Sequence, residues 1–281
     1  MVFGLRTSLA FLAAVLCIAP NLASQARSQP DVREQAWLVL HSGLENKWAS
    51  RRCAAVQALS LMQGDRRAVR FAVSALRDKN FHVRATAAMT LGNLHDFSTL
   101  PELHSALKDP EVSVVLAAAH SLYLLHDKDA YQIYYAILMG DQKSSDGLVQ
   151  SQLDRLKDPK QLLQMGFEEG IGFVPFGGMS YEAYRQLRSS GDSGARVAAA
   201  HILANDPDPI TEDALMQTAL SDKNELVQLA ALDALAERGD PKCIERLALN
   251  LDNAKSSVQY RTAAAIIHLS DVQLRGKRPH H

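Results

Sequence analysis

The sequence predicts an all-α protein, an α-solenoid of about seven short helical-pair repeats that form an α/α superhelix. A segment with a polar turn, Val-Arg, two alanines and spaced leucines spans residues 78–94, and related segments recur along the chain. One equivalent position in each segment falls at residues 52, 84, 115, 196, 228 and 259. Neighbouring segments therefore follow one another at intervals of 31 or 32, except for one interval of 81. A period near 31 indicates an array in which each pair of helices buries its apolar face against its neighbours.

Polar turns divide each repeat into an outer and an inner helix. We expect a first outer helix through residues 36–44 and its inner partner at 48–62. The same pattern predicts outer helices at 66–76, 99–107 and 128–139 and inner helices at 81–94 and 111–125. The boundary before residue 112 is a strong helix start. Asp109 offers an oxygen acceptor for the free amides of the first turn, Pro110 has a backbone angle suited to that turn, and the negative charge of Glu111 interacts favourably with the helix dipole. The repeats are expected to occupy residues 27–270, followed by a basic, flexible tail at 271–281.

Alanine pairs and arginines in the repeated segments have structural interpretations. Small side chains such as Ala87 and Ala88 let neighbouring helices approach closely, and Leu91 fills the layer between them. Four arginines are expected to hydrogen-bond to carboxylates of the turns, such as Asp78, as rungs of a ladder. These are Arg52, Arg84, Arg196 and Arg261. We therefore do not assign them to a substrate site.

The segment 1–26 is expected to lie outside the fold, as a signal peptide. Arg6 precedes an apolar run over residues 9–19, and a segment rich in small residues, LASQA, follows at 22–26, which is typical of secretory signals. The run is shorter than the roughly 20 apolar residues that cross a bilayer. We expect cleavage after Ala26, or nearby after Ser24, with an uncleaved anchor as the alternative. The mature protein is then exported, either periplasmic or secreted.

Two cysteines, Cys53 and Cys243, remain in the expected mature chain. One belongs to an early repeat and the other to a late one. An extended array would hold them much farther apart than the roughly 5 to 7 Å that a disulfide needs between Cα atoms. We expect both to be small packing residues.

The interval of 81, from position 115 to position 196, exceeds two periods of 31 by 19, and we assign this excess to an insertion within residues 165–184. Five glycines alternate there with aromatic residues, and Pro175 interrupts any helix. Such a loop either packs against its own scaffold or contacts a partner, and exposed aromatic rings suit a protein or a membrane surface. The candidate binding residues are Phe167, Phe173, Phe176, Tyr181 and Tyr184.

Charge is unevenly distributed along the chain. The net charge of −1 gives no reason to expect a nucleic-acid partner. Residues 27–84 have a net charge of +6, from 11 Lys/Arg and 5 Asp/Glu, whereas residues 85–281 have −8, from 18 and 26. The candidate basic patch for an anionic partner comprises Arg51, Arg66, Arg67 and Arg70. The alternative is an ordinary solvated helix face.

Familiar catalytic signatures are absent from the sequence, which contains no GxSxG, HExxH, Rossmann or P-loop motif. Two His-Asp pairs, His95-Asp96 and His126-Asp127, lie one period apart at equivalent helix ends. They offer four weak candidate metal ligands. The alternative is that both aspartates cap the helices that follow. We expect no cofactor.

The motif DxxxxVRxxAAxxL occurs as DKNFHVRATAAMTL at 78–91 and less fully as SDKNELVQLAALDAL at 221–235. It resembles short HEAT repeats of the type found in phycobilisome lyases, over about residues 31–270 and weakly at 140–190. The resemblance implies the fold. Some relatives are bilin lyases, and deoxyhypusine hydroxylase holds two irons with His-Glu pairs, whereas this chain has no His-Glu dipeptide.

These features predict a non-catalytic, exported scaffold that mediates protein–protein interaction through its concave face and the insertion. Whether the protein is an enzyme stays open, with the non-catalytic role favoured. One alternative is a metal-dependent or lyase-type enzyme. The other is a membrane-peripheral adaptor that contacts lipid through Phe173 and Phe176. The sequence predicts neither the identity of the partner nor the oligomeric state.

Overall fold

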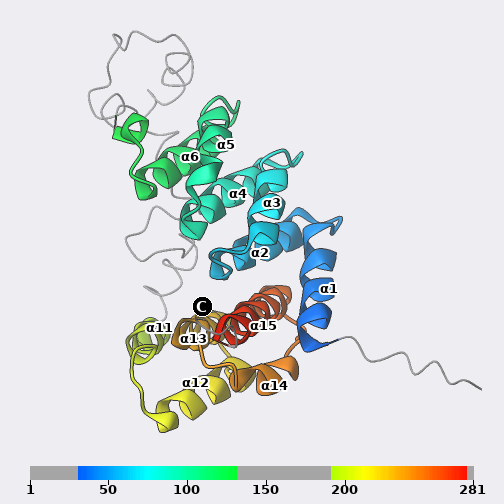
Figure 1. The fold of residues 1–281 in the computed structure, drawn as a ribbon, viewed down its shortest axis with the longest axis vertical. Coiled ribbons are helices and arrows are strands. Elements are labelled where there is room, and N and C mark those ends of the chain that lie inside the picture. The colour runs from blue at the N-terminus through cyan, green and yellow to red at the C-terminus, as the bar shows by residue number, and fades with distance from the viewer. Residues whose placement is uncertain (1–30, 132–190, 277–281) are drawn as a thin grey trace, which may run out of the picture.

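The computed structural model describes residues 31–131 and 191–276, and these residues form helices joined by short turns (Figure 1). No strand occurs in these ranges, and the observed helices agree with the predicted outer and inner helices up to residue 125 to within a few residues. Of the helix predicted at 128–139, residues 128–131 are helical and the others lie outside the described residues. The predicted all-α solenoid is therefore confirmed. Its elements are α1 (Val32–Leu44), α2 (Ala49–Ala58), η1 (Leu59–Leu61), α3 (Arg66–Ala75), α4 (Phe81–Leu94), η2 (Phe97–Thr99), α5 (Leu100–Ala106), α6 (Val112–Leu124), α11 (Gly191–Leu203), α12 (Pro209–Ser221), α13 (Glu225–Arg238), α14 (Cys243–Ala248) and α15 (Ser256–Gly276).

The helices form two curved rows. The inner row runs in the order α11, α13, α15, α2, α4 and α6, and each helix packs against the next. Helices α12, α14, α1, α3 and α5 form the outer row, on the convex side (Figure 1). A helix inside the inner row therefore has two inner neighbours and one or two outer partners, as α15 has in α1 and α14, which leaves the face turned away from the outer row free.

The spatial order of the repeats differs from their order in the sequence. We expected an elongated array that follows the chain, but the last helix, α15, packs against the first two, α1 and α2. The buried ring of Tyr260 lies against Gly43, and Arg33 donates to Asp271 at 2.8 Å. The C-terminal repeats thus precede the N-terminal ones in space. The free ends of the described array are α6 and α11, which adjoin residues 132–190 in the sequence.

The expectation that a flexible tail begins at residue 271 is wrong for residues 271–276. Helix α15 continues to Gly276. Asp271 receives two hydrogen bonds from Arg33, through Nε at 3.1 Å and Nη2 at 2.8 Å, and this ion pair fixes the last turns against α1. Residues 277–281 lie outside the described part of the chain.

Small side chains let the inner helices approach closely, as the sequence predicts. Ala87, Ala88 and Leu91 are all fully buried. A methyl group on Gly92 of α4 would lie 2.6 Å from the Ser121 hydroxyl of α6. The same hydroxyl donates to the Ala88 carbonyl at 2.8 Å, so the close approach also satisfies a buried polar group.

The predicted arginine ladder is present at the turns that precede the inner helices. Arg52 donates to both carboxylate oxygens of Asp78, at 2.7 and 2.8 Å, and Arg84 makes the same pair of bonds to Asp109. Arg196 pairs with the next turn carboxylate in the other half of the chain, that of Asp222. These arginines join successive repeats and have structural roles.

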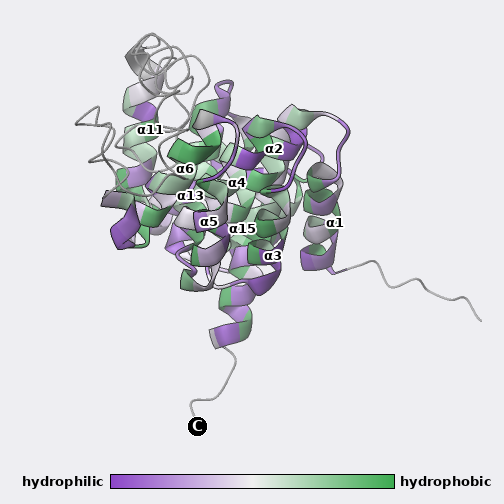
Figure 2. Cartoon of the chain, turned by 90° about the horizontal axis from the view of Figure 1, so that it is seen from above, coloured by the Kyte–Doolittle hydropathy of each residue, from purple (hydrophilic) through white to green (hydrophobic). Residues whose placement is uncertain are grey.

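Hydropathy follows this architecture. The turns are largely hydrophilic, whereas helices such as α4 and α6 have long hydrophobic stretches (Figure 2). The core consists mainly of alanine, leucine and valine side chains from both halves of the chain. None of the described helices is both long and apolar enough to cross a bilayer.

Candidate functional site

The free faces of the inner helices form one surface, which we call the inner surface. On α2 and α4 its mid-helix residues include Ala54, Gln57, Thr86 and Met89, all of which keep some exposure to solvent. On α13 the equivalent stripe contains Leu226, Leu229 and Asp233, and on α15 it contains Arg261 and His268. Because α15 packs against α2, this surface continues from one half of the chain to the other. It combines partly exposed apolar side chains with polar groups, a composition suited to contact with another protein.

Arg261 occupies the point where the two halves meet. Its Nη2 donates to Asp233 on α13 at 2.9 Å. Its Nη1 donates to the Gln57 carbonyl of α2 at 3.0 Å and to the Ser60 hydroxyl of η1 at 3.0 Å. One guanidinium group therefore binds residues from both halves, and its carboxylate partner lies within α13, not in a turn as predicted.

Burial governs the ionisation of two inner-helix histidines. Desolvation lowers the pKa of His120 on α6. Desolvation and the nearby charge of Arg275 lower the pKa of His268 on α15, against an opposing effect of Asp271. Both imidazoles are thus biased towards the neutral form.

A second edge of the array is formed by the turns after the inner helices. His95 and His126 adopt left-handed backbone conformations, with φ of 52° and 56°, where the turns of other repeats have Gly64 and Gly239. Asp96, which follows His95, accepts a hydrogen bond from the Ser98 amide at 2.9 Å. Asp127 likewise accepts one from the Asp129 amide at 2.9 Å. The two aspartates therefore cap the segments that follow, as the capping interpretation predicts.

The structure does not bring the two predicted His-Asp pairs together as a four-ligand site. Within residues 31–131 and 191–276, the group of three candidate ligands whose atoms all lie within 4.8 Å of one another is His104, Asp127 and Asp129. Of the four predicted residues, Asp127 alone belongs to it. His95 instead contacts the Asn93 carbonyl through Nδ1, at 3.0 Å.

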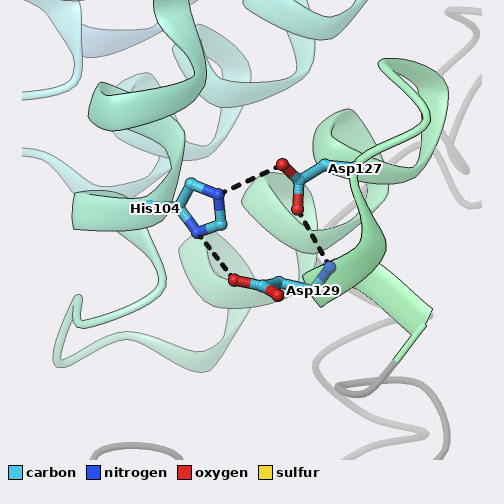
Figure 3. A group of neighbouring side chains, drawn as sticks. All are labelled: His104, Asp127 and Asp129. Atoms are coloured by element: carbon cyan, nitrogen blue, oxygen red, sulfur yellow. Dashed lines mark hydrogen bonds and ion pairs between the residues drawn. The ribbon is translucent and has the colours of Figure 1, made fainter.

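His104 lies between the two carboxylates (Figure 3). The imidazole projects from α5, Asp127 follows the turn after α6, and Asp129 lies in the helical segment that begins at residue 128. The Nε2 atom is 3.4 Å from Asp127 Oδ2, and Nδ1 is 3.7 Å from Asp129 Oδ2. The side chains of His104 and Asp127 are 34% and 20% exposed, and that of Asp129 is 58% exposed. The group is thus partly sheltered and open to solvent on one side.

Sequence reasoning missed His104 and Asp129, although a signal was available. Subtraction of one period of 31 places Val73 at the position of His104 and Ser98 at that of Asp129. Only the capping aspartate is shared, as Asp96 and Asp127. A comparison of aligned repeats would therefore have marked the two departures from the pattern.

The predicted basic patch is divided between two helices. Arg51 is on α2 and exposed, and Arg66 and Arg70 are on α3 and exposed. Arg67 stacks on the ring of Trp37, 4.1 Å from its centroid, so part of its role is to cover that buried side chain. In the described ranges none of these four arginines forms an ion pair. The patch stays a prediction.

The five aromatic residues predicted to bind a partner, Phe167, Phe173, Phe176, Tyr181 and Tyr184, lie outside the described residues. The cysteines lie within them, and both are free thiols. We expected them to lie far apart in space. Instead, α14, which carries Cys243, neighbours α1 and thus the repeat of Cys53. Burial raises the pKa of both thiols, that of Cys243 to about 12.

Comparison with known proteins supports the repeat assignment. HEAT repeats match residues 39–123, 74–145 and 182–269. No curated protein sequence matches the chain. Among solved structures, human deoxyhypusine hydroxylase in complex with glycerol is 16% identical, with 85% of this chain and 97% of that chain covered and a TM-score of 0.33.

Two further structures are similar at the same level. The complex of CpcE and CpcF of phycocyanin lyase from Nostoc is 18% identical, with 89% of this chain and 97% of that chain covered and a TM-score of 0.33. An engineered protein is 16% identical, with 87% and 98% covered and a TM-score of 0.27. These low TM-scores say nothing about activity. Because HEAT repeats match well over half of its length, the chain belongs to the family of HEAT-repeat proteins.

Proposed function

We propose that this protein is a non-catalytic, exported scaffold that binds another protein along its inner surface. The observation that carries the proposal is the continuity of the inner row from α11 through α15 and α2 to α6. HEAT repeats generally mediate protein–protein interaction, and an uninterrupted inner surface offers a long contact area for that purpose. Partly exposed apolar residues such as Leu229 and Met89 supply the apolar part of the contact.

The insertion within residues 165–184 is proposed to contribute to the same contact. In the sequence it lies between α6 and α11, which are the two ends of the inner row. Its aromatic residues suit recognition because each ring offers a large apolar area and loses little conformational freedom on binding.

The inner surface can be tested by site-specific photocrosslinking in the native cell envelope. A photoreactive amino acid at Gln57 or Met89 reports on the inner surface, and one at Ser74 or Gln217 reports on exposed positions of the outer helices α3 and α12. We expect one discrete protein adduct from the inner positions and none from the outer ones. Equal adducts from both pairs, or adducts from the outer pair alone, would contradict the proposed surface.

The contribution of the insertion is tested by deletion of residues 170–178. We expect the adduct formed at Met89 to weaken while the circular dichroism and melting temperature of the protein stay unchanged. An undiminished adduct from the deleted protein would remove the insertion from the proposal and leave the inner surface in place.

Export is tested separately, by fractionation and by the mass of the N-terminal peptide. A mature chain that begins at Arg27, or at Gln25, is the expected result. An intact Met1 in protein recovered from the cytoplasmic fraction would rule out export, without affecting the proposed binding surface.

A further inference from the structure

The side chains of His104, Asp127 and Asp129 are more than a capped turn. In the turn after α4, Asp96 performs the same capping role, but Val73 stands at the position of His104 and Ser98 at that of Asp129. The capping oxygen of Asp127 is Oδ1, which accepts the Asp129 amide. Its other oxygen, Oδ2, is the one directed at His104 Nε2. The second carboxylate oxygen of Asp127 therefore contacts the imidazole of His104, at 3.4 Å, and takes no part in the cap.

The other repeats lack this combination of ligand residues. His104 lies 23 residues before the capping residue Asp127, and Asp129 lies two residues after it. The same two offsets can be counted from the capping aspartate of each other turn. Around Asp65, Asp96 and Asp240, the first position holds Ser42, Val73 and Gln217, and the second holds Arg67, Ser98 and Lys242. The histidine and the second carboxylate thus occur together in one of these four aligned turns.

Charge around the group favours a cation. Two carboxylates face one imidazole, and within the described residues no Lys or Arg forms an ion pair with Asp127 or Asp129. Even a protonated His104 would leave a net negative charge. Lys128 lies between the two aspartates in the sequence without forming an ion pair with either in the described structure.

One pair of the ligand atoms has the spacing of a metal site, and the oxygen of Asp129 faces the other ring nitrogen, Nδ1, at 3.7 Å. Zn²⁺ binds histidine nitrogen and carboxylate oxygen at about 2.0 to 2.2 Å, which separates tetrahedral ligands by about 3.3 Å. The distance between His104 Nε2 and Asp127 Oδ2 is 3.4 Å. Asp129 is the most exposed of the three and has to rotate to bring an oxygen to the same side of the ring. Water would complete the coordination.

We propose that His104, Asp127 and Asp129 form a binding site for a divalent first-row transition cation, with Zn²⁺ as the preferred ion. One imidazole with two carboxylates suits this class better than Mg²⁺ or Ca²⁺, which prefer oxygen ligands throughout. The site joins α5 to Asp127 and to the helical segment that begins at residue 128, so a bound ion cross-links the outer helix of one repeat to the start of the next repeat. It does not depend on the proposed binding of a protein partner.

The test is calorimetric titration of Zn²⁺ into the untagged full chain. His280 and His281 are both replaced by alanine in every sample, because two adjacent terminal histidines bind metal by themselves. We expect one equivalent of Zn²⁺ to bind and Mg²⁺ at the same concentration to give no isotherm. The doubly substituted variant His104→Val/Asp129→Ser copies the residues of the preceding repeat, so the turn keeps its cap and is expected to fold. Its affinity for Zn²⁺ should be at least about tenfold lower than that of the parent.

The matched control is His95→Ala/His126→Ala, which removes two exposed histidines from the same edge but none of the three ligands. We expect it to bind Zn²⁺ like the parent. Circular dichroism of each variant without metal establishes that the fold is unchanged. As a second readout, Zn²⁺ should raise the melting temperature of the parent and of the control, but not that of the His104→Val/Asp129→Ser variant.

Two results would overturn the proposal. One is an absence of stoichiometric Zn²⁺ binding in the parent. The other is an isotherm for the His104→Val/Asp129→Ser variant that equals the parent isotherm, which would place the ion elsewhere. A preference for Mg²⁺ or Ca²⁺ over Zn²⁺ would refute the assigned class of cation.

Discussion

The ring of Tyr260 on α15 lies directly against Gly43 on α1, so closely that a methyl group on Gly43 would be 2.6 Å from the nearest ring atom. The same methyl group would lie 2.8 Å from the Ala55 side chain. Glycine is needed here because two parts of the chain that are far apart in sequence meet at this position. The contact links the last described helix to the first.

The substitution Gly43→Ala is expected to destabilise the protein. Overpacking costs about 1 to 3 kcal/mol, reduced by the roughly 0.5 to 1 kcal/mol that alanine contributes to helix stability over glycine. Urea denaturation measures the difference. Gly276→Ala is the control, because a methyl group there would meet nothing within 4 Å. The double variant Gly43→Ala/Tyr260→Leu should lose less free energy of unfolding than the sum of the losses in the two single variants. Losses that simply add would show that the contact is not tight.

The arginine ladder predicts that two equivalent arginines, Arg52 and Arg196, contribute very differently to the free energy of unfolding. Arg52 is 8% exposed and bonds to Asp78 and to the carbonyls of Asn46 and Lys47, whereas the Arg196 side chain is 44% exposed. We expect Arg52→Ala to lower the free energy of unfolding by about 3 to 5 kcal/mol, because it removes the cationic partner of the mostly buried Asp78 carboxylate. Arg196→Ala should cost about 1 kcal/mol or less. Similar losses for both variants in urea denaturation would refute this account.

Acidification should weaken the fold through His268. Its folded pKa is lowered, so below the unfolded value of about 6.5 the unfolded chain binds a proton more readily than the folded one. The free energy of unfolding therefore falls as pH drops from about 6.5 through the folded pKa, and this group has no effect well above pH 7. The variant His268→Gln should flatten the dependence between pH 7 and 5, as measured by urea midpoints. His82→Gln, at an exposed position, serves as the control, and an equal flattening there would contradict the assignment.

The two thiols should react slowly in the folded protein. Burial raises the pKa of Cys53, and it raises that of Cys243 to about 12, so little thiolate is present at pH 8. We expect incomplete modification by a thiol reagent in minutes under native conditions and full modification in denaturant. Cys243 should be the slower of the two because it is buried, whereas Cys53 is partly exposed. Peptide mapping after timed alkylation distinguishes them, and rapid labelling of Cys243 would contradict its burial.

The contacts of Arg261 predict that the two halves unfold together. Replacement of Arg261 by methionine keeps most of its apolar stem but removes the bonds to Asp233, Gln57 and Ser60. Hydrogen exchange should then rise in both α2 and α13. The control is Arg246→Met, which removes an exposed ion pair with Asp213. Increased exchange confined to α13 would mean that the halves are energetically independent.

The helix boundaries could be predicted because their causes are local. Asn80 caps α4 by accepting from the His82 amide, and Asp65 caps α3 by accepting from two amides, interactions that depend only on neighbouring residues. The arginine ladder was predictable for a similar reason, because Arg52 reaches the turn of the next repeat, 26 residues later.

The order of the repeats in space was not predictable from their period. All repeats present similar small residues to their neighbours, so periodicity gives the spacing along the chain but not which repeats lie side by side. The deciding contacts join the two ends of the described chain, such as Arg33 with Asp271. The ligand group was missed for a different reason: His104 and Asp127 come from separate elements, and motif searches read residues close in sequence.

The packing of α15 against α1 has a consequence for biosynthesis. The ribosome makes α1 first and α15 last of the described helices, so the flank of α1 that receives Tyr260 stays uncovered through almost the entire synthesis. The first repeat to emerge is therefore among the last to be completed. A nascent or truncated chain that lacks α15 would expose this apolar flank, and such surfaces in incomplete chains are prone to aggregate.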